Sequence, residues 1–141
     1  MSTSSPYSTR AVLFDLDGTL LDTALDMVRS LNLLLQEEGV PTVDPSIARQ
    51  CVSDGTKALV TLGFGEHQTT EQFERRCQRY LTIYEENLSV DTVFFDGMAE
   101  TVEFLEEHGV LWGIVTNKPA FLTEPLLKAL ALDTRASVVL S

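Results

Sequence analysis

Two aspartates separated by one leucine, Asp15 and Asp17, are the residues of this sequence best suited to chemistry. Gly18 follows directly and lets the backbone turn sharply and approach a ligand closely. Mg²⁺ binds proteins through one or two carboxylates together with water and phosphate oxygens. Neighbouring carboxylates can also differ in protonation, one acting as nucleophile or metal ligand and the other as proton donor. This division suits transfer of a phosphoryl group through an aspartyl-phosphate.

Other interpretations of the Asp15–Gly18 segment compete with this chemistry. A surface turn stays open for the motif alone, because Asp and Gly are common turn residues. An EF-hand calcium loop has its glycine at the sixth position and follows a helix, whereas Gly18 is fourth and follows an apolar run. The nucleotide-binding pattern G-x-x-x-x-G-K-[ST] does not occur in the sequence. Calcium and nucleotide loops are therefore excluded.

A second polar group, Thr116 and Asn117, follows another apolar run at 110–115. Thr and Asn often end strands and cap helices without any ligand, so this pair alone does not establish a site. Lys118 either adds positive potential to such a site or is an ordinary solvated lysine before a proline.

The elements that must position these residues alternate between strands and helices. Apolar runs at 11–14, 110–115 and 137–140 predict strands of a parallel sheet. The carboxyl ends of such strands share one edge, where ligands of open α/β sheets bind. We therefore expect an α/β fold whose Rossmann-like parallel sheet places both polar groups at one edge.

Residues 24–89 have helical periodicity and no strand signal, which predicts an inserted all-helical cap over that edge. The expected organisation is a loose tail at 1–10, a sheet core at 11–23 and 90–141, and the cap at 24–89. The expected helix starts are a capping box at Thr23–Asp26, the Asp44–Pro45 pair, a capping box at Thr69–Gln72, and Asp96.

Composition limits the partners of the chain. Its 141 residues include 10 Lys+Arg and 21 Asp+Glu, for a net charge of −11. Such a charge disfavours nucleic acid and anionic membranes, so a phosphate site needs local positive potential from a metal ion, backbone N–H groups or a few Lys and Arg. Neither a signal peptide nor a membrane span is predicted, so we expect a cytoplasmic protein. Cys51 and Cys77 are expected to be free thiols.

The motifs resemble those of a known family. The segment FDLDGTLLDT, Phe14 to Thr23, is similar to the first motif of the haloacid dehalogenase (HAD) superfamily, and Val115 to Pro119, VTNKP, is similar to the second. The order of the motifs and the helical segment between them strengthen the resemblance, which spans residues 11–141. Within the superfamily, phosphoglycolate phosphatase-like enzymes are most similar, with phosphatases of sugar phosphates as close competitors.

The resemblance implies roles for five residues. Asp15 would attack phosphorus and bind Mg²⁺. Asp17 would protonate the leaving alkoxide, then activate water, with its backbone carbonyl on the metal. Gly18, Thr116 and Asn117 would bind the phosphoryl group of a small phosphorylated metabolite. The acid at Asp17 favours phosphate-ester hydrolysis over dehalogenation.

The sequence departs from the family pattern after its third strand. The family places a charge-balancing lysine and further acidic metal ligands beyond the position of Ser141. Two hypotheses follow from the sequence. The protein is a Mg²⁺-dependent phosphatase, or it is a truncated non-catalytic fragment that binds partners or self-associates through an exposed sheet edge.

Overall fold

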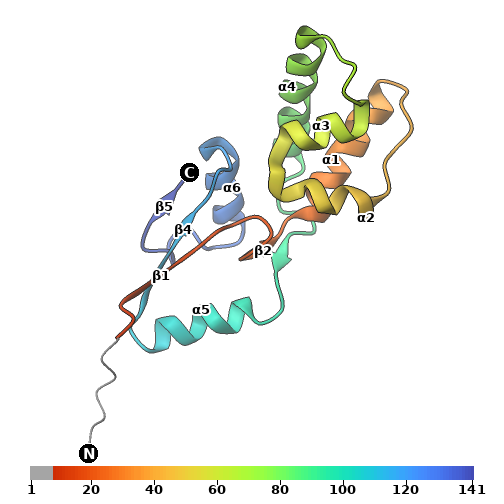
Figure 1. Ribbon diagram of the computed structural model, residues 1–141. Coiled ribbons are helices and arrows are strands. Elements are labelled where there is room, and N and C mark those ends of the chain that lie inside the picture. Colours follow the sequence, from red (N-terminus) through yellow and green to blue (C-terminus); the bar gives the residue numbers. More distant parts are fainter. Residues whose placement is uncertain (1–7) are drawn as a thin grey trace, which may run out of the picture.

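The computed structural model describes residues 8–141, so most of the predicted tail at 1–10 lies outside the described residues. Figure 1 shows a sheet with two helices beside it and a separate group of helices. The strands are β1 Ala11–Phe14, β2 Leu21–Asp22, β3 Val93–Phe94, β4 Leu111–Val115 and β5 Val139–Leu140. The helices are α1 Ala24–Glu37, α2 Pro45–Ala48, the 3₁₀ helix η1 Arg49–Asp54, α3 Gly55–Phe64, α4 Thr70–Glu86, α5 Met98–Glu107 and α6 Ala120–Ala129.

The three predicted strands form one parallel sheet in the order β1-β4-β5. Trp112 and Ile114 of the central strand β4 are buried and pack with leucines of α5 and α6 on one face. The other face stays open, since Leu13 and Leu111 are 60% and 61% exposed. The predicted parallel α/β arrangement is confirmed.

A second, two-stranded sheet was not predicted. β2 pairs antiparallel with β3, Leu21 opposite Phe94, where the chain leaves and re-enters the sheet core. Each strand has two residues, too few for an alternating pattern to be recognised in the sequence.

The segment 24–86 contains helices and no strand, as predicted. Its helices, which we call the helical block, enclose a hydrophobic cluster that includes Leu31, Leu35 and Tyr80 and is joined by Leu122 of α6. No helix within residues 8–141 is long and apolar enough to cross a membrane.

Helices begin at or next to all four predicted starts, but two of the four predicted side-chain caps are absent. Asp44 accepts the backbone N–H of Ser46, and Thr69 forms a complete capping box with Gln72. Thr23 precedes α1 but makes no side-chain cap, because its hydroxyl donates to Asp17 instead. The residue directly before α5 is Gly97, not Asp96. Gly97 has φ of 83°, a left-handed conformation that favours glycine.

Candidate active site

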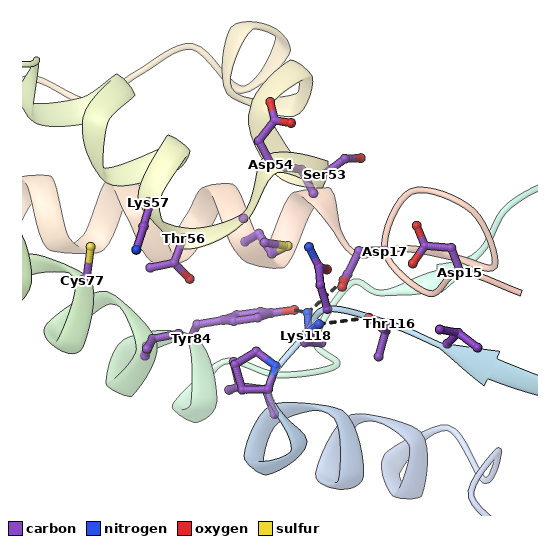
Figure 2. A pocket seen from close by; sticks show the side chains of 18 residues that line it. Asp15, Asp17, Ser53, Asp54, Thr56, Lys57, Cys77, Tyr84, Thr116 and Lys118 are labelled. Atoms are coloured by element: carbon purple, nitrogen blue, oxygen red, sulfur yellow. Dashed lines mark hydrogen bonds and ion pairs between the residues drawn. The ribbon is translucent and has the colours of Figure 1, made fainter. Parts of the chain in front are cut away.

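The polar ends of β1 and β4 meet in one cleft with a volume of about 850 Å³ between the sheet core and the helical block. Four predicted site residues line it: Asp15, Asp17, Thr116 and Asn117. Figure 2 shows Asp15, Asp17 and Thr116 close to the start of the loop after β4. Gly18 instead lines a smaller neighbouring pocket of about 200 Å³, so the structure does not bring it to this cleft.

The loop after β1 is a tight turn built on backbone hydrogen bonds. The N–H of Leu21 donates to the carbonyl of Leu16 at 3.0 Å, and the N–H of Gly18 donates to the carbonyl of Leu21 at 3.0 Å. Gly18 has φ of 79°, and a Cβ there would lie 2.8 Å from Oγ of Ser53 in the helical block. The turn therefore requires glycine both for its backbone conformation and for its close approach to the helical block.

The two carboxylates of this loop have different surroundings. Asp15 is exposed, and its Oδ1 accepts the N–H of Leu16 at 2.7 Å. The Asp17 side chain is 10% exposed, and its Oδ1 accepts both the hydroxyl of Thr23 at 2.7 Å and the ammonium of Lys118 at 2.8 Å. The pair is thus asymmetric, with one accessible carboxylate and one held by two side chains.

The surroundings of Lys118 show which of its two interpretations holds, a source of positive potential at the site or an ordinary solvated lysine. It is 5% exposed, so it is not a solvated lysine. Its Nζ donates to Asp17 and to the hydroxyl of Tyr84 of α4, the latter at 2.8 Å. Burial lowers the pKa of Lys118, while the charge of Asp17 opposes that shift. Burial also raises the pKa of the Tyr84 hydroxyl, which therefore stays protonated. The sequence left both interpretations of Lys118 open, and no sequence signal pointed to its burial.

The loop after β4 is held close to the sheet. The N–H of Thr116 donates to the carbonyl of Leu140 at 2.8 Å, and its hydroxyl accepts the N–H of Lys118 at 3.1 Å. Asn117 is exposed at the cleft. α6 begins three residues later and accommodates Pro125 within its length.

The helical block contributes the opposite wall of the cleft, including Lys57, Thr56 and Cys77. Lys57 lines the cleft, whereas Arg49 lies outside it and pairs with Asp22 at 3.0 Å. Burial raises the pKa of the Cys77 thiol and Lys57 opposes this shift.

The donor set agrees in part with a Mg²⁺ ion. The carboxylate of Asp15 and the backbone carbonyl of Asp17 are oxygen ligands of the kind that Mg²⁺ prefers, and the hydrogen bond from Leu16 to the Asp15 carboxylate ends on Oδ1, which leaves Oδ2 to other partners. Within residues 8–141 no group of three or more His, Cys, Asp or Glu is placed to hold a metal. A Mg²⁺ ion held by one or two protein oxygens takes its other ligands from water and phosphate oxygens.

Comparison with known proteins identifies the family. The model of the haloacid dehalogenase-like hydrolases matches residues 12–141. The chain belongs to this family. It is 39% identical to an N-acetylmuramic acid 6-phosphate phosphatase of Pseudomonas putida and 40% identical to a phosphoglycolate phosphatase of Xanthomonas campestris, each over 131 residues.

These alignments cover 93% of this chain but 59% of either relative, so the chain spans about 59% of their length. A crystal structure of a predicted phosphoglycolate phosphatase from Haemophilus somnus is similar with a TM-score of 0.82 and 25% identity, over 96% of this chain and 64% of that one. The predicted HAD-like α/β fold is therefore confirmed.

Proposed function

We propose that the full-length protein is a Mg²⁺-dependent phosphatase that hydrolyses a small phosphomonoester through an aspartyl-phosphate. The observation that carries this proposal is the meeting of Asp15 and Asp17 with Thr116 and Asn117 in one cleft. Membership of the hydrolase family and relatives named as phosphatases support it.

In the first step, a carboxylate oxygen of Asp15 attacks phosphorus and the ester P–O bond breaks. The leaving alkoxide takes a proton from Asp17. In the second step, water attacks the phosphorus of the acyl phosphate, gives a proton to Asp17, and releases inorganic phosphate and the Asp15 carboxylate. A bound Mg²⁺ would neutralise charge on the phosphoryl oxygens.

Thr116 and Asn117 would hold the phosphoryl oxygens, a role supported by their position in the lining of the same cleft as Asp15 and Asp17. The helical block would act as a cap that excludes water and contacts the rest of the substrate. The names of the relatives make phosphoglycolate and N-acetylmuramic acid 6-phosphate the substrates to test first.

The test is turnover of these two esters and of p-nitrophenyl phosphate, with Mg²⁺ and with a chelator. Asp15→Asn removes the nucleophile and is expected to lower kcat by at least about a thousandfold. Asp22→Asn is the matched control, because Asp22 follows in the same segment but pairs with Arg49 outside this cleft. Full activity of Asp15→Asn, or activity unaffected by the chelator, would contradict the proposal.

A further inference from the structure

A continuous series of side-chain contacts joins the helical block to the aspartate loop. Tyr84 of α4 accepts a hydrogen bond from Lys118, Lys118 pairs with Asp17, and Asp17 also accepts the hydroxyl of Thr23. Figure 2 shows Tyr84 reaching across the cleft to Lys118 and Asp17. Lys118 is 101 residues from Asp17 and 34 from Tyr84, so the contact exists only when the helical block lies against the core.

The burial of Lys118 makes this contact more demanding than a surface ion pair. A buried ammonium needs a paired charge and hydrogen-bond acceptors, because water no longer solvates it. Lys118 has three N–H donors, and Asp17 and Tyr84 accept two of them. Its side chain also lies 4.6 Å from the centre of the Tyr84 ring, which adds a cation–π contact.

The geometry constrains how Asp17 faces the cleft. Both of its donors, Thr23 and Lys118, end on Oδ1. Two donors on one oxygen fix the rotation of the carboxylate and direct Oδ2 to other partners. A proton donor needs such a fixed orientation, since proton transfer requires hydrogen-bond distance to the reacting oxygen.

We infer that Lys118 is a positioning residue for Asp17, and that Tyr84 makes this positioning depend on contact between the helical block and the core. The inference rests on the proposed function for its effect on catalysis. It adds a role for two residues, Lys118 and Tyr84, that neither the motif resemblance nor the relatives' names assign.

Tyr80 provides a matched comparison within the same helix. It is fully buried one turn before Tyr84, and its hydroxyl donates to the carbonyl of Met27 at 3.2 Å. That bond stays inside the helical block and does not reach Lys118. Removal of either hydroxyl therefore removes one buried hydrogen bond of α4. Only removal of the Tyr84 hydroxyl also takes an acceptor from Lys118.

The kinetic test compares Tyr84→Phe, Tyr80→Phe and Lys118→Met, each corrected for its folded fraction by thermal unfolding. A lost hydrogen bond to a charged group predicts that kcat falls about tenfold in Tyr84→Phe and about a hundredfold in Lys118→Met. KM should stay within about twofold, because orientation of the proton donor is lost rather than binding. Equal losses in Tyr84→Phe and Tyr80→Phe would overturn the inference.

A double-mutant cycle separates positioning from general stability. With Asp17→Asn as background, Lys118→Met should lower kcat by less than about twofold further, since nothing remains to be positioned. A full additional loss in that background would assign Lys118 a role independent of Asp17 and would overturn the inference.

A second measurement does not depend on activity. Lysine ammonium groups that are shielded from water give ¹H–¹⁵N NMR signals, so the protein labelled at lysine nitrogen should show one for Lys118. The signal should vanish in Lys118→Met, shift or broaden in Tyr84→Phe and Asp17→Asn, and stay unchanged in Tyr80→Phe. No turnover in the unmutated protein would refute the proposed function alone. A signal insensitive to Tyr84→Phe would refute the link to the helical block.

Discussion

Two of the contacts between the helical block and the sheet core differ in kind. Away from the cleft, Asp26 of α1 is fully buried and accepts the backbone N–H groups of the returning segment 90–92 at 2.9–3.1 Å, together with the hydroxyl of Thr92. At the cleft, the contact is made by side chains alone: the ammonium of Lys118 donates to Asp17 and to the hydroxyl of Tyr84.

This difference separates a structural joint from a functional contact. Backbone donors hold Asp26 whatever side chains stand at 90–92, and α1 and the returning segment are thereby tied together. Asp17 instead depends on two particular side chains, and it lines a cleft that a ligand can enter. We therefore expect mutations at Asp26 to change stability and mutations around Asp17 to change turnover.

The largest expected effect on stability belongs to Asp26→Asn. The amide would place N–H groups against backbone N–H donors and would break the pairing with Arg29. The buried donors of residues 90–92 would lose a charged acceptor, and an unsatisfied buried donor costs about 1 to 3 kcal/mol, so we expect a decrease of about 3 to 5 kcal/mol in the free energy of unfolding, measured by urea denaturation.

Asp91→Asn is the control, because Asp91 also pairs with Arg29 but its side chain is 46% exposed. Removal of an exposed pair predicts a decrease of less than about 1 kcal/mol. If both variants lost the same stability, Asp26 would not be the structural joint that we describe.

Gly18→Ala should give the next largest effect, because it affects the loop and the helical block together. A non-glycine residue at φ of 79° is strained, and its Cβ would lie 2.8 Å from Oγ of Ser53. We expect about 2 kcal/mol of destabilisation in thermal or chemical unfolding, in line with the cost of left-handed backbone.

Ser53→Ala, added to Gly18→Ala, separates the two causes. It removes the oxygen that the new Cβ would meet but leaves the backbone strain. Partial recovery of stability is expected, whereas no recovery would show that the approach of this loop to Ser53 is not tight.

The sequence predicted the parts of the site that depend on local signals. Apolar runs that end in polar residues located Asp15, Asp17, Thr116 and Asn117 at one sheet edge, and the cleft brings these four together. It could not predict the burial of Lys118, because that depends on Asp17, 101 residues away, and on the packing of α4.

Asp26 shows the same difficulty in another form. Its spacing from Thr23 is typical of a capping box, yet both side chains bind partners outside the helix start. A local pattern cannot show that a distant segment competes for the same side chain. Tertiary contacts therefore determine the hydrogen-bond partners of Thr23 and Asp26.

Thr23→Val tests the cleft contact with a smaller expected effect. The change keeps the shape of the side chain but removes one of the two donors to Asp17. We expect kcat to fall by at most about tenfold, since Lys118 still holds the carboxylate. Thr23→Ser retains the hydroxyl and should keep most of the activity, and an equal loss in both variants would refute this explanation.

The substitution Lys57→Met tests whether the helical block contacts the substrate directly. It lines the cleft from the first turn of α3 and is exposed to solvent. An exposed ion pair with a substrate carboxylate is weak, so Lys57→Met should raise KM for phosphoglycolate by no more than about fivefold. KM for p-nitrophenyl phosphate, which has no carboxylate, should change less than about twofold, and the difference should shrink as salt screens the pair. Lys128 is an exposed residue of α6 that does not line the cleft, so Lys128→Met should leave both values unaltered. Equal rises for the two esters would place Lys57 at the phosphoryl group rather than at the far end of the substrate.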